Sequence, residues 1–314
     1  MSDNVADLGE FGLIAAIRAR MPQPDHVIVG PGDDAAVVAS PDGRVVASTD
    51  LLVEGNHFRR DWSSAYDVGR KAAAVNLADI VAMGARPTAL LVGFGGPADL
   101  PSEWVLQLAD GLREEGNLIG VSVVGGDVVR SDMLVVAVTA LGDLAGRSPV
   151  LRSGARDGDV VAVAGRLGWA AAGLAVLARG FFSPRVLVDA QRRPQVPYEA
   201  GIGGAEAGAT AMCDVSDGLL ADLGHIAEAS AVAIDVASAA FTVADEMRDA
   251  ARALGADPME WILTGGEDHA LAGTFPPGVP LPDGWPKIGS VSAGTGVTVD
   301  GAAYQGSAGH DHFK

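Results

Sequence analysis

Short acidic segments that follow apolar runs are the feature of this chain that most constrains its fold. The clearest is Gly125-Gly126-Asp127, which follows the valine-rich run 121–124. Because glycine permits a sharp turn, this pattern predicts a buried strand that ends in a glycine turn and presents a carboxylate at its tip. We expect similar segments elsewhere in the chain to converge with it on one site. These are Gly32-Asp33-Asp34, Ser48-Thr49-Asp50, Asp214-Val215-Ser216-Asp217-Gly218 and Gly265-Gly266-Glu267-Asp268.

Aspartates recur at these positions in a way that suggests bound cations. Taken singly, each is more often a solvated surface charge, but several carboxylates gathered in one site repel one another unless cations stand between them. Oxygen-rich clusters without soft ligands suit Mg²⁺, which keeps several waters and bridges to substrate phosphates. The set therefore predicts a site for magnesium and phosphates. Its members are Asp34, Asp50, Asp79, Asp127, Asp214 and Asp217.

The charge of the chain supports this interpretation. The formal net charge of −18 argues against nucleic-acid and anionic-membrane partners, because both need basic patches. A phosphate-binding chain with only Lys71, Lys287 and Lys314 as lysines needs another positive charge, and metal ions provide one. The N-terminus lacks an apolar signal segment, and no uninterrupted apolar run reaches about 18 residues. We therefore expect a cytoplasmic protein.

Several common catalytic motifs are missing from the sequence. There is no G-x-x-x-x-G-K-[ST] loop and no G-x-G-x-x-G after an apolar run, which argues against the usual nucleotide-binding loops. The absence of H-E-x-x-H and C-x-x-C disfavours zinc, and the absence of G-x-S-x-G disfavours an esterase. Two alternatives to an enzyme remain, namely a non-catalytic regulator that binds a nucleotide or Mg²⁺, and an acidic structural protein with solvated loops.

Strands and helices are mixed in both halves, and some strands are joined by short hairpins. This pattern favours an α+β or mixed α/β fold, with domains at residues 1–146 and 147–314. A long helix is predicted over 65–83, and the three-residue spacing of Asn76 and Asp79 places both on one face of it. Ser216 is predicted to cap a helix through residue 229. The proline- and arginine-rich stretch 183–197 is predicted to be irregular.

In their order along the chain, these motifs resemble the thiamine-monophosphate kinase family. This family is part of a larger group that includes aminoimidazole ribonucleotide synthetase and selenophosphate synthetase. Gly55-Asn56-His57-Phe58 and the closing Asp311-His312-Phe313 favour the thiamine-phosphate branch, and the lack of an early cysteine disfavours selenophosphate synthesis. The other matching segments are Gly9-Glu10-Phe11, Gly32-Asp33-Asp34-Ala35, Ser48-Thr49-Asp50, 74–79, 82–85, Gly125-Gly126-Asp127, Arg152-Ser153-Gly154, 214–219 and Gly265-Gly266-Glu267-Asp268.

The resemblance implies a two-domain PurM-like fold, with an N-terminal β-sheet domain that binds ATP and magnesium and dimerises, and a C-terminal α/β domain. It implies ATP-dependent phosphorylation of thiamine monophosphate to thiamine diphosphate, the last step of thiamine diphosphate biosynthesis, in a homodimer. ATP is the co-substrate in this family, and several Mg²⁺ ions assist a direct in-line transfer. The acceptor is a phosphate monoester, which is mostly dianionic near pH 7 and needs no general base.

The resemblance also implies the roles of individual residues. Asp127 and Arg152 serve catalysis, with Arg152 as a phosphate clamp. His57 and Glu267 contact the thiamine substrate, and Ser307 stands where the family often has an aromatic substrate contact, with Tyr304 nearby. Gly126, Asp127, Arg152 and Ser216 contact ATP. The magnesium ligands are Asp34, Ser48, Thr49, Asp50, Asp79, Asp127, Asp214 and Asp217, where the choice of Asp34 over Asp33 follows from the resemblance alone.

Overall fold

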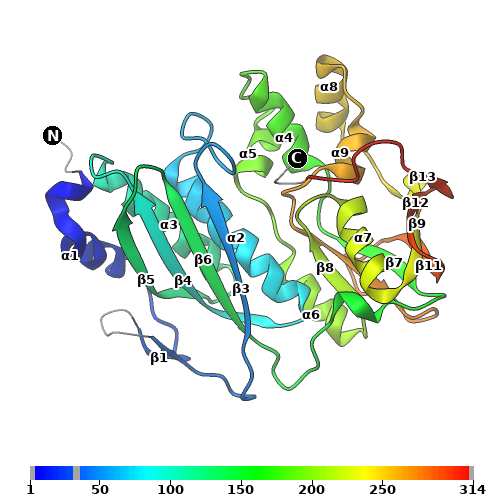
Figure 1. Ribbon diagram of the computed structural model, residues 1–314, viewed down its shortest axis with the longest axis horizontal. Coiled ribbons are helices and arrows are strands. Elements are labelled where there is room, and N and C mark those ends of the chain that lie inside the picture. Colours follow the sequence, from blue (N-terminus) through cyan, green and yellow to red (C-terminus); the bar gives the residue numbers. More distant parts are fainter. Residues whose placement is uncertain (1–3, 31–35, 311–314) are drawn as a thin grey trace. The chain divides into compact units, whose positions relative to one another are not determined.

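The structure, a computed structural model, describes residues 4–30 and 36–310 and divides into two compact units (Figure 1). Unit 1 comprises Met1–Ile80 and Arg86–Arg147, and unit 2 comprises Val81–Ala85 and Ser148–Lys314. Each unit contains a β-sheet together with helices, so the predicted mixed α/β class is confirmed. In the parts of the chain that are described, no helix combines the length and the apolar character needed to cross a membrane.

Unit 1 is built on a four-stranded sheet of order β3-β6-β4-β5. Its strand pairs are antiparallel except β4 with β5, which run parallel. Parallel neighbours need a crossover, and α3 provides it here. The strands are β3 (Val46–Val53), β4 (Arg86–Gly96), β5 (Ser122–Arg130) and β6 (Val135–Asp143), and the crossover helix is α3 (Ser102–Asn117).

Two helices cover one face of this sheet, α3 and α2 (Ala65–Ala82) (Figure 1). They approach closely because glycines lie where they meet. A Cβ atom on Gly69 would lie 2.1 Å from the carbonyl oxygen of Leu108, and one on Gly111 would lie 2.1 Å from that of Tyr66. Unit 1 also contains α1 (Val5–Arg18) and an antiparallel ribbon of β1 (Val27–Val29) and β2 (Val37–Val38).

The opposite face of the sheet, which we call the open face, carries the alternate residues of each strand. Strand residues that pair directly across a sheet point to the same side, so the register defines this face. It is relatively apolar, and Leu51 and Val129 are 52% and 53% exposed on it. Its residues include Thr49, Leu51, Leu91, Gly93, Asp127, Val129, Ala137 and Thr139.

Unit 2 is built on a seven-stranded sheet of order β13-β12-β9-β11-β7-β10-β8. All neighbours are antiparallel except β9 and β12. The strands are β7 (Val160–Ala164), β8 (Ala211–Val215), β9 (Val232–Val236), β10 (Ala270–Phe275), β11 (Lys287–Ala293), β12 (Gly296–Val299) and β13 (Ala302–Ala303).

The helices of unit 2 bury apolar side chains such as Leu223 and Ile226 of α7, which are fully buried. The helices are α4 (Trp169–Ala178), α5 (Arg185–Arg192), α6 (Tyr198–Glu206), α7 (Leu219–Ser230), α8 (Asp245–Leu254) and α9 (Pro258–Thr264), with short 3₁₀ turns η1 (Arg152–Gly154) and η2 (Ser238–Ala240). The prediction that 183–197 is irregular is wrong, because α5 lies within it. Pro184 and Pro194 flank this amphipathic helix and do not interrupt it, while Leu187 and Val188 are buried.

The predicted glycine turn at Gly125-Gly126-Asp127 is also wrong. These residues lie inside β5, where Gly126 pairs with Val92 and Asp127 pairs with Gly93 of β4. A Cβ atom on Gly126 would lie 2.0 Å from the carbonyl oxygen of Val92. The glycine therefore permits close approach of two strands and does not reverse the chain.

The predicted cap of α7 needs a similar correction. The helix begins at Leu219. Its N-cap residue is Gly218, which has no side chain to cap the first turn. Gly218 has φ +133°, and a Cβ atom there would lie 2.5 Å from the carbonyl oxygen of Thr264. Ser216 lies before this glycine, so it is too early in the chain to cap the helix.

Candidate active site

The first polar cluster lies between β3 and α2 in unit 1. The Ser48 hydroxyl donates to Asp79 Oδ2 at 2.5 Å, and the Asp50 main-chain N–H donates to Asn76 Oδ1 at 2.9 Å. Ser48 and Asp50 are two residues apart in a strand, so both face α2. The prediction that Asn76 and Asp79 share a helix face is confirmed, because both meet β3. We call Ser48, Asp50 and Asp79 the β3–α2 cluster.

Two other predicted metal ligands of unit 1 lie on the open face instead. The Thr49 hydroxyl donates to the carbonyl oxygen of Val138 at 3.0 Å and accepts from Thr139 Oγ1 at 3.1 Å. Asp127 is exposed, and its Oδ1 accepts the N–H of Val128 at 2.9 Å. The sheet therefore separates these side chains from the β3–α2 cluster. Asp34 lies outside the described residues.

His57 is fixed by the turn that follows β3. The N–H of Val53 donates to His57 Nδ1 at 3.1 Å, and the N–H of His57 donates to the carbonyl oxygen of Val53 at 3.0 Å. Because Nδ1 accepts, the neutral ring carries its proton on Nε2. Lys71, a buried residue of α2, donates to the carbonyl oxygen of His57 at 3.2 Å and ties this turn to the helix.

The second polar cluster lies at the carboxyl end of β8 in unit 2. Asp214 pairs with Leu271 of β10, and its Oδ2 lies 3.1 Å from Nδ1 of His269. Glu267 and His269 have φ values of +66° and +50°. Their N–H groups donate to the carbonyl oxygens of Ser216 and Val215, at 2.8 and 3.0 Å. The turn at 265–269 is therefore bonded directly to the Asp214–Asp217 segment.

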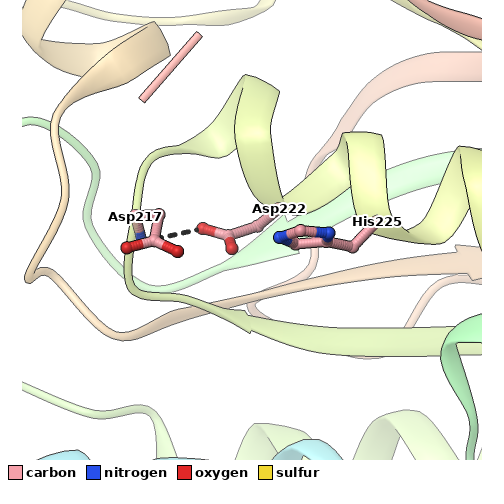
Figure 2. Close-up of side chains that lie close together, drawn as sticks. All are labelled: Asp217, Asp222 and His225. Carbon is pink, nitrogen blue, oxygen red and sulfur yellow. Dashed lines mark hydrogen bonds between the residues drawn. The ribbon is translucent and has the colours of Figure 1, made fainter. Parts of the chain in front are cut away.

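Asp222 of α7 holds the same segment from the other side. Its Oδ2 accepts the N–H groups of Asp217 and Gly218, each at 3.1 Å, and so replaces the predicted serine cap. Figure 2 shows Asp217, Asp222 and His225 side by side, with ligand atoms that all lie within 4.8 Å of one another. The sequence analysis missed Asp222 and His225. Their three-residue spacing on a helix that follows the acidic segment was the signal available.

Negative charge is concentrated at this second cluster. The pKa of Asp222 is raised to about 7, mainly by burial and also by the charges of Asp214 and Asp217, against the bonds from the Gly218 and Asp217 amides. Carboxylates in such proximity favour a cation between them.

The donor atoms of both clusters fit magnesium. Ser48, Asp50 and Asp79 in unit 1, and Asp214 and Asp217 in unit 2, offer only hydroxyl and carboxylate oxygens, the atoms that Mg²⁺ prefers.

The predicted ATP contacts of unit 2 lie at opposite ends of α7. Ser216 precedes the helix, and its carbonyl oxygen bonds to Glu267. Arg152 lies in η1, and its carbonyl oxygen accepts a hydrogen bond of 2.8 Å from the hydroxyl of Ser230, the last residue of α7. The side chain of Arg152 is exposed.

A cavity of about 720 Å³ lies beside α7 and is lined in part by Asp217, His225, Tyr304 and His310. The N–H of His310 donates to the carbonyl oxygen of Asp217 at 2.9 Å, which holds the C-terminal segment against the second cluster. Ser307 is exposed, and its hydroxyl donates to the carbonyl oxygen of Gly309 at 2.7 Å. Of the two residues considered for the aromatic contact, Tyr304 is the one that lines the cavity.

Known proteins with similar sequences share both units. Residues 32–144 match the AIR synthase related protein, N-terminal domain, and residues 156–273 match the corresponding C-terminal domain. The thiamine-monophosphate kinase of Mycobacterium tuberculosis is 52% identical over 314 residues, covering 99% of this chain and 94% of that protein. The thiamine-monophosphate kinase of Corynebacterium glutamicum is 43% identical over 298 residues, covering 92% and 87%.

Solved structures of thiamine-monophosphate kinases are also similar to this chain. The structure of AaThiL complexed with AMPPCP and TMP matches with a TM-score of 0.81 and 33% identity, over 100% of both chains. The thiamine-monophosphate kinase of Stenotrophomonas maltophilia K279a also matches with a TM-score of 0.81 and 33% identity, over 93% of this chain and 96% of that one. The similarity therefore extends through both units.

Proposed function

The chain belongs to the thiamine-monophosphate kinase branch of the AIR synthase related protein family, and we propose that it phosphorylates thiamine monophosphate with ATP. The products are thiamine diphosphate and ADP, so the enzyme is a phosphotransferase with a phosphate group as acceptor. The observation that carries this conclusion is the match along the whole chain to a structure that holds AMPPCP, an ATP analogue, together with TMP. The 52% identity to a thiamine-monophosphate kinase supports it.

Phosphoryl transfer to a phosphate monoester depends on positioning and charge neutralisation more than on proton transfer. The acceptor monophosphate is mostly dianionic near pH 7 because its second pKa is about 6, so no side chain has to remove a proton from it. The difficulty is to bring two polyanions together in line. Oxygen-rich clusters at fixed places in both units suit this task, because they fix where cations and phosphates bind.

Magnesium ions are the proposed partners of these clusters. Ser48, Asp50 and Asp79 would hold magnesium in unit 1, and Asp214 and Asp217 would hold it in unit 2. When bound, the ions would neutralise phosphate charge and orient the transferred group. The chain's own contribution is to fix the ligands: Asp222 and the turn at 265–269 hold the Asp214–Asp217 segment in place.

Two open-face residues, Thr49 and Asp127, also remain proposed magnesium ligands. Their side chains point to the other face of the sheet, so they cannot bind the same ion as the β3–α2 cluster of their own sheet. Asp127 and Gly126 lie together in β5, which supports a contact with the nucleotide. Arg152 is the proposed phosphate clamp, and its exposed side chain is compatible with that role.

Two residues are proposed to contact the acceptor. His57 is held as the Nε2–H tautomer by the Val53 amide, so it offers a donor suited to a phosphate oxygen. Glu267 lies next to the second cluster, where a carboxylate suits the cationic thiazolium ring of thiamine. Tyr304 lines the cavity along α7 and is proposed to supply the aromatic contact that the serine at position 307 cannot make.

We also propose that the protein is a homodimer joined through unit 1 and that it acts in the cytoplasm. The open face exposes Leu51 and Val129, and the outer strands of this sheet are β3 and β5. Uncovered apolar sheet faces and edge strands are surfaces that proteins usually cover. A second copy of the same face is the proposed cover.

A coupled assay of ADP release tests the function. We expect turnover with ATP, Mg²⁺ and thiamine monophosphate, and none when free thiamine is the acceptor. If no ADP is released with either acceptor, while the protein still binds ATP, the result would favour a non-catalytic regulator. ADP release without any acceptor would point to an ATPase and would contradict the proposal.

A further inference from the structure

His269, which follows the Gly-Gly-Glu-Asp motif, is buried against a proposed magnesium ligand and has no role in the chemistry described so far. Its Nδ1 lies 3.1 Å from Asp214 Oδ2, and the two side chains are 4% and 5% exposed. A carboxylate can only accept, so Nδ1 donates this hydrogen bond. The bond joins the end of β8 to the turn before β10, 55 residues further along the chain.

The backbone fixes where this ring lies. His269 has φ +50°, in the left-handed region, where His, Asn and Asp are several-fold enriched among residues other than glycine. Its N–H donates to the carbonyl oxygen of Val215 at 3.0 Å, one residue beyond Asp214. The main chain of His269 is therefore bonded to the same segment that its side chain contacts. One hydrogen bond joins its N–H to Val215, and the other joins its ring to Asp214.

The contact determines the orientation of the Asp214 carboxylate. Oδ2 is engaged by the ring, so Oδ1 is the oxygen that a cation would take. Mg²⁺ requires near-ideal octahedral geometry and is usually bound through one or two carboxylates. A ligand of this kind is sensitive to the direction in which its oxygen points, and hydrogen-bonded neighbours of metal ligands typically change metal affinity or activity by about 10–100-fold when they are removed.

We propose that His269 is a positioning residue for the metal site of unit 2. Its Nδ1–H holds the Asp214 carboxylate so that Oδ1 faces the cation, and His269 itself touches neither substrate nor metal. The inference rests on the proposed function, because it takes Asp214 to be a metal ligand.

The competing explanation is a purely structural role. A buried hydrogen bond between two distant segments stabilises a fold, and its loss leaves a buried carboxylate with fewer partners, which lowers stability. Both explanations predict that removal of His269 lowers the melting temperature. They differ in the metal affinity of the protein that remains folded.

Three variants of His269 separate the explanations. His269→Asn keeps an N–H donor at the position of Nδ1 and tolerates a positive φ, so it should retain metal binding to within a few-fold. His269→Ala removes the donor, and His269→Gln moves it one bond further from the main chain. The Gln variant keeps a polar side chain of similar length, so it serves if the Ala variant does not fold.

The readout is binding of Mn²⁺ and Mg²⁺ without acceptor, by calorimetry and by electron paramagnetic resonance of Mn²⁺, well below each variant's melting temperature. The relevant site is the one that Asp214→Asn abolishes. We expect His269→Ala and His269→Gln to weaken this site by about 10–100-fold. The KM for thiamine monophosphate should change little at saturating metal.

Thr210→Val is the matched structural control. Thr210 precedes β8 at its opposite end and donates a part-buried hydrogen bond to Asp159 Oδ2 at 2.6 Å. Its replacement should lower the melting temperature and leave metal affinity unchanged. If Thr210→Val weakened metal binding as much as His269→Ala, the effect would be one of general stability and the inference would be wrong.

Two further results would overturn the inference in distinguishable ways. Wild-type affinity in both His269→Ala and His269→Gln would reject the positioning role and leave the proposed function intact. A wild-type protein in which Asp214→Asn removes no metal site would reject Asp214 as a ligand. The inference would then fail together with that part of the proposed function.

Discussion

Several polar side chains in this protein are held in place by hydrogen bonds from the main chain. His57 is an example, because the Val53 amide assigns its proton to Nε2. Asp268 is another, since it accepts the N–H groups of Gly168 and Ala170 at the start of α4 while it is almost fully buried. In both cases main-chain N–H groups hold the side chain, and each residue leads to a separate prediction.

His57→Ala should impair use of the acceptor more than the chemical step. A hydrogen bond to a charged group contributes about 1.5–3 kcal/mol, which corresponds to about 10- to 150-fold in affinity. We therefore expect the KM for thiamine monophosphate to rise by that factor while kcat changes little. His26→Ala is the control, because His26 is a part-buried histidine of unit 1 bonded to the carbonyl oxygen of Thr88. An unchanged KM in His57→Ala would reject the contact.

Asp268 should make stability depend on pH. Burial raises its pKa to about 7, although the Ala170 and Gly168 amides oppose this. The folded protein then holds a proton that the unfolded chain releases near pH 4. As the pH rises from about 4 to about 7, this group lowers the free energy of unfolding by up to about 1.4 kcal/mol per pH unit. Above about pH 7 the loss is complete.

The comparison that isolates this effect is wild type against Asp268→Asn, because asparagine does not titrate. The difference in melting temperature in favour of wild type should be larger at pH 5 than at pH 8. Asp257→Asn changes an exposed cap of α9 and provides the control, with a difference that stays the same at both values. A constant difference for Asp268→Asn would show that its pKa is not raised.

At the scale of elements, β5 shows what the sequence could and could not predict. Its apolar run correctly indicated a strand, but a glycine pair is compatible both with a turn and with close packing of strands. Only the position of Val92 decides between them. Likewise, the side of the sheet on which Asp127 lies depends on register, because a shift of one residue moves every side chain to the other face.

Helical spacing was the more reliable guide. It placed Asn76 and Asp79 on one face of α2, and the structure confirms this through their bonds to β3. It failed at α5, where prolines on both sides concealed an amphipathic helix. The contact of His269 with Asp214 could not be predicted, because the pairing of β8 with β10 joins residues that are far apart in the sequence.

Gly126→Ala tests the account of β5. The new Cβ atom would overlap the carbonyl oxygen of Val92, so the two strands must separate. Overpacking of this kind costs about 1–3 kcal/mol, and the shift moves Asp127, so activity should fall as well. Gly203→Ala is the control, because at this position in α6 no atom outside the adjacent helix backbone lies within 4 Å of the added carbon, so the change should be neutral or slightly stabilising. Chemical denaturation and the ADP-release assay measure both effects.

The protein is proposed to be a homodimer joined through the open face of unit 1, and a substitution on that face tests this. Leu51→Lys places a charge on that face, where a second copy would bury it. We expect light scattering after size exclusion to show a dimer for wild type and a monomer for this variant. Phe181→Lys changes a similarly exposed apolar residue of unit 2, which is 60% exposed against 52% for Leu51, and should leave the dimer intact. A wild-type monomer at micromolar concentration would contradict the proposal.

The central claim is that the chain joins the γ-phosphoryl group of ATP to the phosphate of thiamine monophosphate. Phosphorus-31 NMR of a mixture with ATP and Mg²⁺ observes this directly. The account predicts that the monophosphate signal is replaced by the paired doublets of thiamine diphosphate, in amounts equal to the ADP formed. Formation of ADP with inorganic phosphate, while thiamine monophosphate remains unchanged, would contradict it.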